Sequence, residues 1–378
     1  MRPLEILGYA SIYITNGEIG HLVEQKEFAG TFERSDGVVR NGSLGRNAPA
    51  EDAMKFLLAV FFLLGWRIQA ESLLQTFGSG TNQFQIEFVE VGNPANAADT
   101  TGSPNPAGSV AYTYNLGKYE ISRDMVIKAN TLGGLGLTLG SLAVYGGNGP
   151  DRPATGMGWV EAAKFVNWLN TSTGNQAAYK ISGSTFQLWT SADLGYQANN
   201  PYRNSLAKFW LPSAHEWYKG AYGSPDGTWY DYPTMAVPAK VTGGTNAATS
   251  VYGQAVGTGP ADVTNAGGLS AYGTMGQGGN VWEWTESAHD GVNNSSTENR
   301  EVRGSWWKES LLSYQSASLR SSVDPATETL GDASSTLNIG FRVAGIPEPG
   351  SGALLALGVG GIMAIKGRRR ALSRSESR

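Results

Sequence analysis

The stretch 278–285 constrains this chain more than any other. It reads GGNVWEWT, which places two tryptophans, a carboxylate and an amide directly after two glycines. In an extended segment alternate side chains point to the same face, so Trp282 and Trp284 share one face and Val281 and Glu283 share the other. Glycines allow backbone conformations that suit close approach to a core or an ion. On this stretch alone, a tryptophan-rich core strand and an ion-binding loop both remain open.

Composition narrows the class of protein. The chain has 378 residues, of which 51 are glycine and only 16% are charged, which is typical of a loop-rich globular protein. Acidic residues outnumber basic ones, with a formal net charge of -4, so we expect no nucleic acid partner. There is no cysteine, which excludes disulfides, thiolate-bound metals and cysteine nucleophiles.

Residues 54–70 follow the plan of a secretory signal peptide. Met54 is followed by one positive charge, then by the apolar run 56–64, and a small residue, Ala70, stands at a plausible cleavage point. We therefore expect translation to begin at Met54 and residues 1–53 to be a non-native or disordered leader. A buried or membrane-spanning helix is the alternative, although the run is shorter than the roughly 20 residues that span a bilayer.

The end of the chain has a separate organisation. Within residues 346–370, a Pro-Glu-Pro triplet precedes the apolar run 353–365, which a basic cluster follows; residues 371–378 form a basic tail. This arrangement resembles the PEP-CTERM sorting signal. The resemblance implies processing by exosortase-type sorting machinery, membrane contact through this segment before processing, and a location at the cell envelope, outer surface or extracellular matrix of a Gram-negative-type bacterium. A short ordinary C-terminal anchor is the alternative, and in both cases the basic cluster stays in the cytoplasm with the domain outside.

Residues 71–345 are expected to form one domain of short strands, two helices and long loops. Alternation of apolar and polar residues predicts a strand over 83–89, and the composition of 91–109 and of 222–279 predicts loops. The spacing of apolar residues predicts a helix from Trp159, capped by Gly158, that ends before Gly174. A second helix is expected to begin with a capping box of Ser213 and Glu216. Residues 341–344 are expected to form the final strand.

Four motifs give this domain a resemblance to a known family. They read WLPSAHEW over 210–217, GGNVWEW over 278–284, RGSW over 303–306 and NIGFRV over 338–343. In this order they resemble the sulfatase-modifying-factor family, which contains the formylglycine-generating enzymes. The resemblance implies an α+β fold that is similar to C-type lectins, with small antiparallel sheets, two main helices and much irregular loop.

The resemblance also implies which chemistry has been lost. Formylglycine-generating members hold copper with two cysteines that follow the motif matching 303–306. Here the segment 307–313 reads WKESLLS and contains no thiol. Because soft thiolates are the ligands that select Cu(I), we expect no copper. A related branch binds iron with three histidines, but His21 precedes the proposed signal, which leaves only His215 and His289; a site that adds Glu283 to these two is the remaining alternative.

Calcium is the cofactor that the resemblance leaves open. In the family a structural Ca²⁺ is bound at the positions that match Gly276, Gly279, Val281 and Glu283. Gly276 has no side chain to donate, and Ca²⁺ takes about six to eight oxygen ligands, so we expect at most a weak site formed by Gly279, Val281 and Glu283. The alternative makes Glu283 a hydrogen-bond acceptor for turn amides.

A ligand-binding surface is expected near the peptide groove that the resemblance implies. Its predicted residues are Ser305, Trp306, Trp307, Tyr314 and Arg320, in which the aromatic rings supply faces and Arg320 supplies a fork for a carboxylate. The alternative is that Trp306 belongs to the core and Arg320 is an internal clamp. We expect an exported domain that binds a ligand or partner of the envelope or its matrix without catalysis. The alternatives are an oxygen-dependent metalloenzyme with altered ligands and a purely structural matrix protein.

Overall fold

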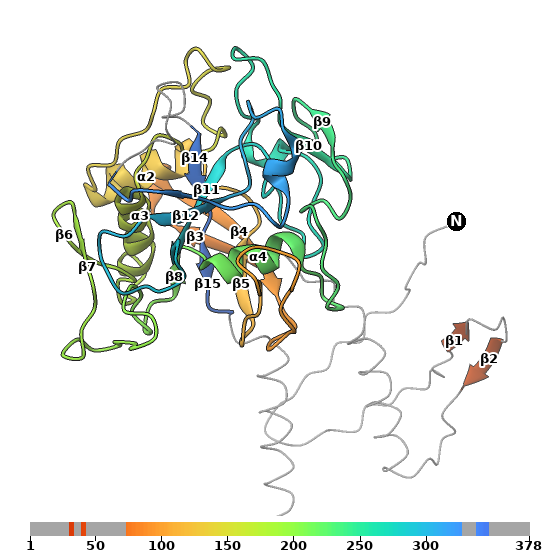
Figure 1. Cartoon of the computed structure of the whole chain (residues 1–378), viewed down its shortest axis with the longest axis horizontal. Coiled ribbons are helices and arrows are strands. Elements are labelled where there is room, and N and C mark those ends of the chain that lie inside the picture. The colour runs from red at the N-terminus through yellow and green to blue at the C-terminus, as the bar shows by residue number, and fades with distance from the viewer. Residues whose placement is uncertain (1–29, 34–38, 43–72, 327–337, 348–378) are drawn as a thin grey trace, which may run out of the picture. The chain divides into compact units, whose positions relative to one another are not determined.

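The computed structural model describes residues 30–33, 39–42, 73–326 and 338–347, in two compact units (Figure 1). The first unit contains an antiparallel hairpin of β1 (Gly30–Glu33) and β2 (Val39–Gly42). The second contains all other elements. The signal-like segment 54–70 and the apolar run 353–365 lie outside the described residues. Among the helices that are described, none has the length and apolar character needed to cross a membrane.

Two sheets form the frame of the larger unit. The first has five strands, in the order β3 (Leu73–Phe77), β4 (Phe84–Val91), β5 (Tyr114–Gly117), β15 (Ala344–Gly345) and β8 (Phe209–Trp210). The second has four strands, in the order β13 (Ser321–Val323), β12 (Arg300–Arg303), β11 (Trp282–Ala288) and β14 (Ile339–Phe341). The strand predicted over 83–89 is confirmed as β4.

Smaller elements complete the frame. An antiparallel pair consists of β6 (Lys180–Ser182) and β7 (Thr185–Gln187), and a parallel pair consists of β9 (Ala239–Val241) and β10 (Thr249–Val251). Short 3₁₀ turns are η1 (Gly80–Asn82), η2 (Val263–Asn265) and η3 (Leu312–Gln315). The α+β class is confirmed. The pairing is not entirely antiparallel, because β11 and β14 also run parallel.

Both predicted helices are present. The helix α3 (Trp159–Thr171) buries the apolar face that the spacing predicted. The helix α4 (Ala214–Tyr222) begins with the predicted capping box: the Ser213 hydroxyl accepts from the Glu216 N–H at 3.2 Å, and the Glu216 carboxylate accepts from the Ser213 N–H at 2.6 Å. These bonds satisfy two N–H groups that a helix start otherwise leaves unpaired.

A third helix, α2 (Arg123–Gly133), was not predicted. Of its apolar side chains only Val126 and Ala129 are fully buried, Met125 packs partly against the core, and Ile127 and Leu132 are exposed, so its apolar face is narrow. Local signals define its ends instead. The Ser122 hydroxyl caps the first turn, and Gly134 ends the helix in the left-handed conformation.

The strand predicted over 341–344 is in fact two strands in different sheets. The chain leaves the four-stranded sheet after Phe341 and enters the five-stranded sheet at Ala344, where β15 pairs with β5 on one side and β8 on the other. Arg342 and Val343 therefore lie at the passage between the sheets (Figure 1).

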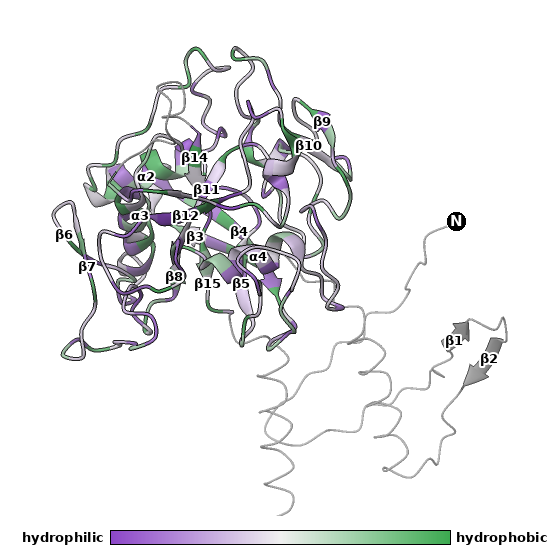
Figure 2. Ribbon diagram, viewed as in Figure 1, coloured by the Kyte–Doolittle hydropathy of each residue, from purple (hydrophilic) through white to green (hydrophobic). Residues whose placement is uncertain are grey.

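The core is aromatic and contains buried charges. Rings pack edge to face, for example Trp159 on Phe186 with centroids 4.9 Å apart. Figure 2 shows hydrophilic residues within the central strands, among hydrophobic ones. On β11 the indoles of Trp282 and Trp284 are buried, and so is Glu283 between them. Both faces of this strand are therefore covered, and its carboxylate requires a partner inside the protein.

Candidate functional site

Glu283 finds its partner in Arg342. The two carboxylate oxygens accept from Nε and Nη2 of Arg342, both at 2.6 Å, and the indole N–H of Trp217 donates to the same carboxylate at 2.7 Å. Arg342 also donates to the carbonyl oxygens of Gly117 at 2.8 Å and Met275 at 2.9 Å. Glu283 and Arg342 are completely buried, so this is a desolvated, two-point ion pair with further hydrogen bonds on the guanidinium.

A second buried carboxylate lies beside this pair. Glu120 follows β5 and is 1% exposed; one of its oxygens accepts from the Asn280 side chain at 2.6 Å, and the other has no hydrogen-bond partner in the described part of the chain. Burial raises the pKa of Glu120 well above its ordinary value, and the charge of Glu283 raises this pKa further. Gly276 lies against it with φ +77°, and a Cβ built there would meet the Glu120 carboxyl group at 3.1 Å.

The predicted calcium ligands can be tested against this geometry. Glu283 already accepts three N–H groups, and a carboxylate has about four acceptor positions, so it retains little capacity for a cation. Gly279 and Val281 offer backbone carbonyls only. These residues supply fewer oxygens than Ca²⁺ takes, and no group of three or more His, Asp or Glu with metal-binding geometry occurs within the residues that the structure describes. The donors to Glu283 are a guanidinium and an indole, and turn amides do not fill this role.

Only some of the residues predicted to form the ligand surface are exposed to solvent. Ser305 and Trp307 are buried, and Ser305 has φ +72°. Trp306 and Tyr314 are half-buried: Trp306 packs edge-on to Trp307 at 5.4 Å with the ammonium group of Lys308 5.6 Å from its centroid. Trp306 and Tyr314 therefore keep one accessible side while the other side packs on the core.

Arg320 acts as an internal clamp in this structure. Its Nη1 donates to the His289 carbonyl at 2.8 Å and to the Glu301 carboxylate at 2.9 Å. Glu301 also binds Arg303, so the carboxylate is shared by two arginines. The side chain of Arg320 is 24% exposed, so most of it is covered by the protein.

The structure does not bring His215, His289 and Glu283 together as one set of ligands. Nδ1 of His215 accepts from the backbone N–H of Gly108 at 3.0 Å. Burial lowers the pKa of both histidines. The charge of Glu301, which lies near both, acts in the opposite direction but does not outweigh burial. Within the part of the chain that the structure describes, no three of His, Cys, Asp or Glu could hold a metal ion together, so the mixed histidine and carboxylate site considered from the sequence lacks support.

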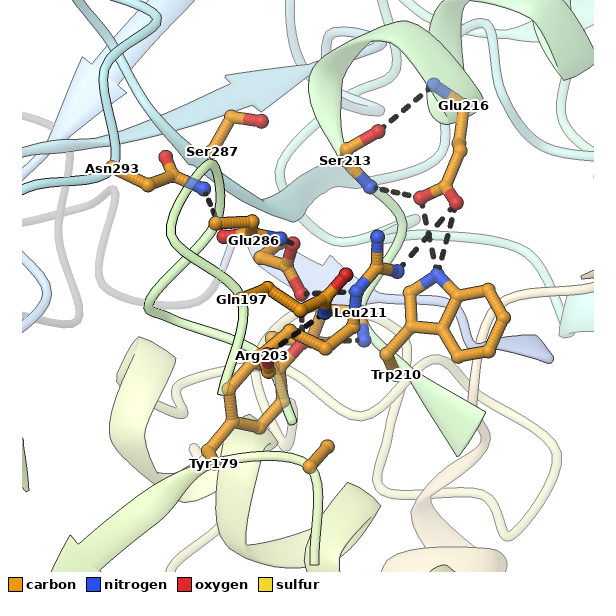
Figure 3. Close-up of polar contacts among 12 residues, drawn as sticks. Tyr179, Gln197, Arg203, Trp210, Leu211, Ser213, Glu216, Glu286, Ser287 and Asn293 are labelled. Carbon is orange, nitrogen blue, oxygen red and sulfur yellow. Dashed lines mark hydrogen bonds and ion pairs between the residues drawn. The ribbon is translucent and has the colours of Figure 1, made fainter. Parts of the chain in front are cut away.

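One buried ionic network was missed by the sequence analysis. Arg203 lies between two buried carboxylates, at 3.5 Å from Glu216 of α4 and 3.5 Å from Glu286 of β11 (Figure 3). The Tyr179 hydroxyl donates to Glu286 at 3.0 Å, and burial raises the pKa of Glu286. Arg203 comes from the loop between β7 and β8, where no periodicity or motif marked it. The network joins this loop, α4 and β11, and therefore acts as a structural centre.

Comparisons with known proteins agree with this fold. Residues 83–345 match the family model described as "Sulfatase-modifying factor enzyme 1-like domain". Among solved structures, "Treponema denticola variable protein 1" aligns with a TM-score of 0.52 at 18% identity, covering 73% of this chain and 100% of that one. CarF aligns with a TM-score of 0.46 at 16% identity, covering 70% of this chain and 99% of CarF. PvdO from Pseudomonas aeruginosa aligns with a TM-score of 0.43 at 16% identity, covering 74% of this chain and 100% of PvdO. A search of curated proteins finds no significant match. At these identities the similarity between structures concerns the fold alone.

Proposed function

The chain belongs to the sulfatase-modifying factor family, and from that premise we propose that it is an exported member that binds a ligand or partner without catalysis. The observation that carries the proposal is the lack of any cysteine in the 378 residues. The copper chemistry of the formylglycine-generating members depends on two thiolates, and nitrogen or hydroxyl groups in segment 307–313 do not replace them. Arg342 and Trp217 donate three N–H groups to Glu283, which leaves this carboxylate little capacity to hold a metal ion in their place.

The accessible sides of Trp306 and Tyr314 form the proposed contact surface. Half-buried aromatic rings held by a rigid frame give contact area at low entropic cost, which is why such residues dominate binding sites. Lys308 beside Trp306 adds positive charge, which favours ligands that carry carboxylate or other acidic groups.

Export is the second part of the proposal, and it depends on the segments 54–70 and 346–370. We propose that the first directs secretion and that exosortase-type machinery processes the second, so that the domain reaches the envelope or its matrix. N-terminal sequencing of the protein recovered from the cell surface tests this. A mature chain that begins near residue 71 supports export by a signal peptide, and one that begins near Met1 contradicts it.

Two measurements on the purified chain separate binding from catalysis. In the first, metal analysis is combined with a measurement of oxygen consumption in the presence of a cysteine-containing peptide. Stoichiometric copper or iron together with oxygen uptake would favour the alternative, an altered metalloenzyme.

In the second measurement, glycan and peptide arrays are probed with the wild type, with Trp306→Ala and with the control Leu311→Ala, which alters a side chain that is 58% exposed. Saturable binding that only Trp306→Ala removes supports the proposal. No saturable ligand on either array favours a purely structural matrix protein.

A further inference from the structure

The loop of residues 99–110, called the strap below, lies against helix α4 and its aromatic side chains (Figure 1). Gly108 fits closely between two rings: its φ is +74°, and a Cβ built on it would lie 2.4 Å from the Trp229 indole and 2.8 Å from the Tyr218 ring. Gly102 is equally close, because a Cβ there would lie 1.8 Å from the Tyr218 hydroxyl. The strap therefore covers Tyr218 and Trp229 as long as these glycines keep their places.

His215 of α4 holds the strap at Gly108. Its Nδ1 accepts from the Gly108 backbone N–H at 3.0 Å, so the proton of the neutral imidazole is on Nε2. Protonation adds a second proton at Nδ1, after which two donors face each other and the hydrogen bond is lost. His215 is the second residue of α4, where the partial positive charge of the helix N-terminus also disfavours an imidazolium. Part of the side chain is open to solvent, so protons can reach the ring.

The other polar contacts of the strap do not change near neutral pH. The Tyr218 hydroxyl donates to Asp99 at 2.5 Å, the Ser103 N–H donates to the Ala317 carbonyl at 3.1 Å, and Arg303 donates to the Ser103 carbonyl. Burial opposes the effect, but hydrogen bonds from Tyr218 and Thr101 lower the pKa of Asp99, which therefore keeps its charge above pH 3.8. Arginine stays protonated and amides do not titrate. Among the described contacts of the strap, the one with His215 is therefore sensitive to mild acid.

The charged groups around His215 do not stabilise its protonated form. Glu301 and Arg303 come from β12, Arg320 lies just before β13, and Glu216 is the next residue of α4. Desolvation is the largest effect and lowers the pKa of His215; the two carboxylates raise this pKa and the two guanidinium groups lower it. The pKa therefore lies below its ordinary value of 6.5, and the neutral, bonded imidazole is the form present at pH 7.

We propose that His215 is a pH-dependent anchor of the strap: the neutral imidazole holds Gly108 against α4, and the imidazolium releases it, so that the strap opens locally and uncovers Tyr218 and Trp229. The remaining contacts keep their partners, so the rest of the domain stays folded. The strap is separate from the Trp306 surface and goes beyond the function proposed above, so either proposal can fail without the other.

Hydrogen exchange of the full chain, followed by mass spectrometry of peptides that cover 99–110, measures this opening. The wild type is compared at pH 4.5 and pH 7.5, after correction for the intrinsic effect of pH on exchange. We expect the protection of the strap to be at least about fivefold lower at pH 4.5, which corresponds to the loss of one hydrogen bond of about 1 kcal/mol. A peptide from α3 is the internal reference, and its protection should not change.

Variants then assign the effect to one ring nitrogen. In His215→Asn the amide oxygen takes the place of Nδ1 as acceptor but does not titrate, so the strap should stay protected at both pH values. In His215→Ala no acceptor remains, and protection should be low at both. His289→Asn is the matched control, because this histidine lies near the same Glu301 and Arg320 and makes no bond to the strap; it should keep the wild-type response.

Three results would overturn the proposal. The first is equal protection of the wild-type strap at pH 4.5 and pH 7.5. The second is a response to pH that persists in His215→Asn or disappears in His289→Asn. The third is a parallel loss of protection in α3, which would mean that acid unfolds the whole domain.

Discussion

Arg342 and Glu283 form an ion pair that connects the two sheets of the domain. Glu283 belongs to β11 of the four-stranded sheet, and Arg342 lies where the chain passes into the five-stranded sheet. The same guanidinium donates to the carbonyl of Gly117 at the end of β5. The sequence presented Glu283 as a metal ligand, whereas the folded protein pairs it with an arginine located 59 residues later.

Removing one partner of this pair should destabilise the fold severely. In Arg342→Met the Glu283 carboxylate stays buried with only the Trp217 indole as donor, and such uncompensated charges cost about 3–5 kcal/mol. Urea unfolding followed by tryptophan fluorescence measures the loss. Lys128→Met is the matched control: it breaks a surface pair with Asp124 and should cost less than about 1 kcal/mol. Equal, small losses in both variants would show that the buried pair contributes little.

Glu120 should make stability fall as pH rises. Its pKa is raised in the folded state above the ordinary value of 4.5, so the folded protein binds one more proton than the unfolded chain between the two values. In that interval the free energy of unfolding decreases by up to about 1.4 kcal/mol per pH unit. The stabilisation from the extra proton on Glu120 is therefore complete below pH 4.5. It is lost as the pH rises to the pKa that Glu120 has in the folded protein.

The Glu120→Gln variant tests this dependence. Comparing its unfolding free energy with that of wild type from pH 4 to pH 8 should show a gap that grows with pH in favour of the variant. Glu90→Gln serves as control, because its side chain is exposed and should follow the wild type. A gap that does not change with pH would contradict the interpretation.

Lys219 should produce the opposite dependence at alkaline pH. This residue of α4 is 1% exposed, and its ammonium group donates to the Asn93 carbonyl at 2.8 Å; burial lowers the pKa of Lys219 to about 8 from 10.5. Between these values the unfolded chain binds the extra proton, so stability rises with pH by up to about 1.4 kcal/mol per unit. Lys219→Met should abolish this rise, whereas Lys240→Met, which changes an exposed lysine, should keep it. Thermal unfolding from pH 7 to pH 10 makes the comparison.

The caps of α4 and α2 provide a prediction about local structure. Ser213→Ala removes the hydroxyl that accepts from the Glu216 N–H, and a lost N-cap costs about 0.5–2 kcal/mol. Ser122→Ala removes the equivalent bond to Met125 at 3.3 Å in α2. The Glu216 carboxylate that binds the Trp210 indole is held by the Ser213 backbone N–H, which alanine retains, so we expect losses of similar size for Ser213→Ala and Ser122→Ala. A much larger loss for Ser213→Ala would mean that its hydroxyl does more than cap the helix.

Much of the frame follows from local signals in the sequence. The helix α3 has a continuous apolar face, α4 has a complete capping box, and β4 alternates apolar and polar residues, so all three were predictable. The helix α2 has a narrower apolar face, in which Val126 and Ala129 are buried and Met125 packs partly against the core. Its stability depends on tertiary contacts, which no local pattern records.

The candidate sites were harder to predict, because their partners are distant in sequence. The motif that contains Glu283 indicated a buried carboxylate, but only the fold shows that Arg342 takes both of its oxygens. Likewise, Arg203 stands in a loop without any motif and yet joins Glu216 to Glu286. The pairings of Glu283 with Arg342 and of Arg203 with Glu286 each cross more than 50 residues, so topology decides them, and topology is what the short patterns leave open.

The position of β15 also determines how the domain responds to a pull. This strand of two residues is hydrogen-bonded on both edges, to β5 and to β8, and Arg342 anchors the chain just before it. A force applied through the residues after Gly345 would load both edges of the strand and the buried ion pair at once. Tethering by this end therefore places the mechanical stress on β15 and on the ion pair that joins the two sheets.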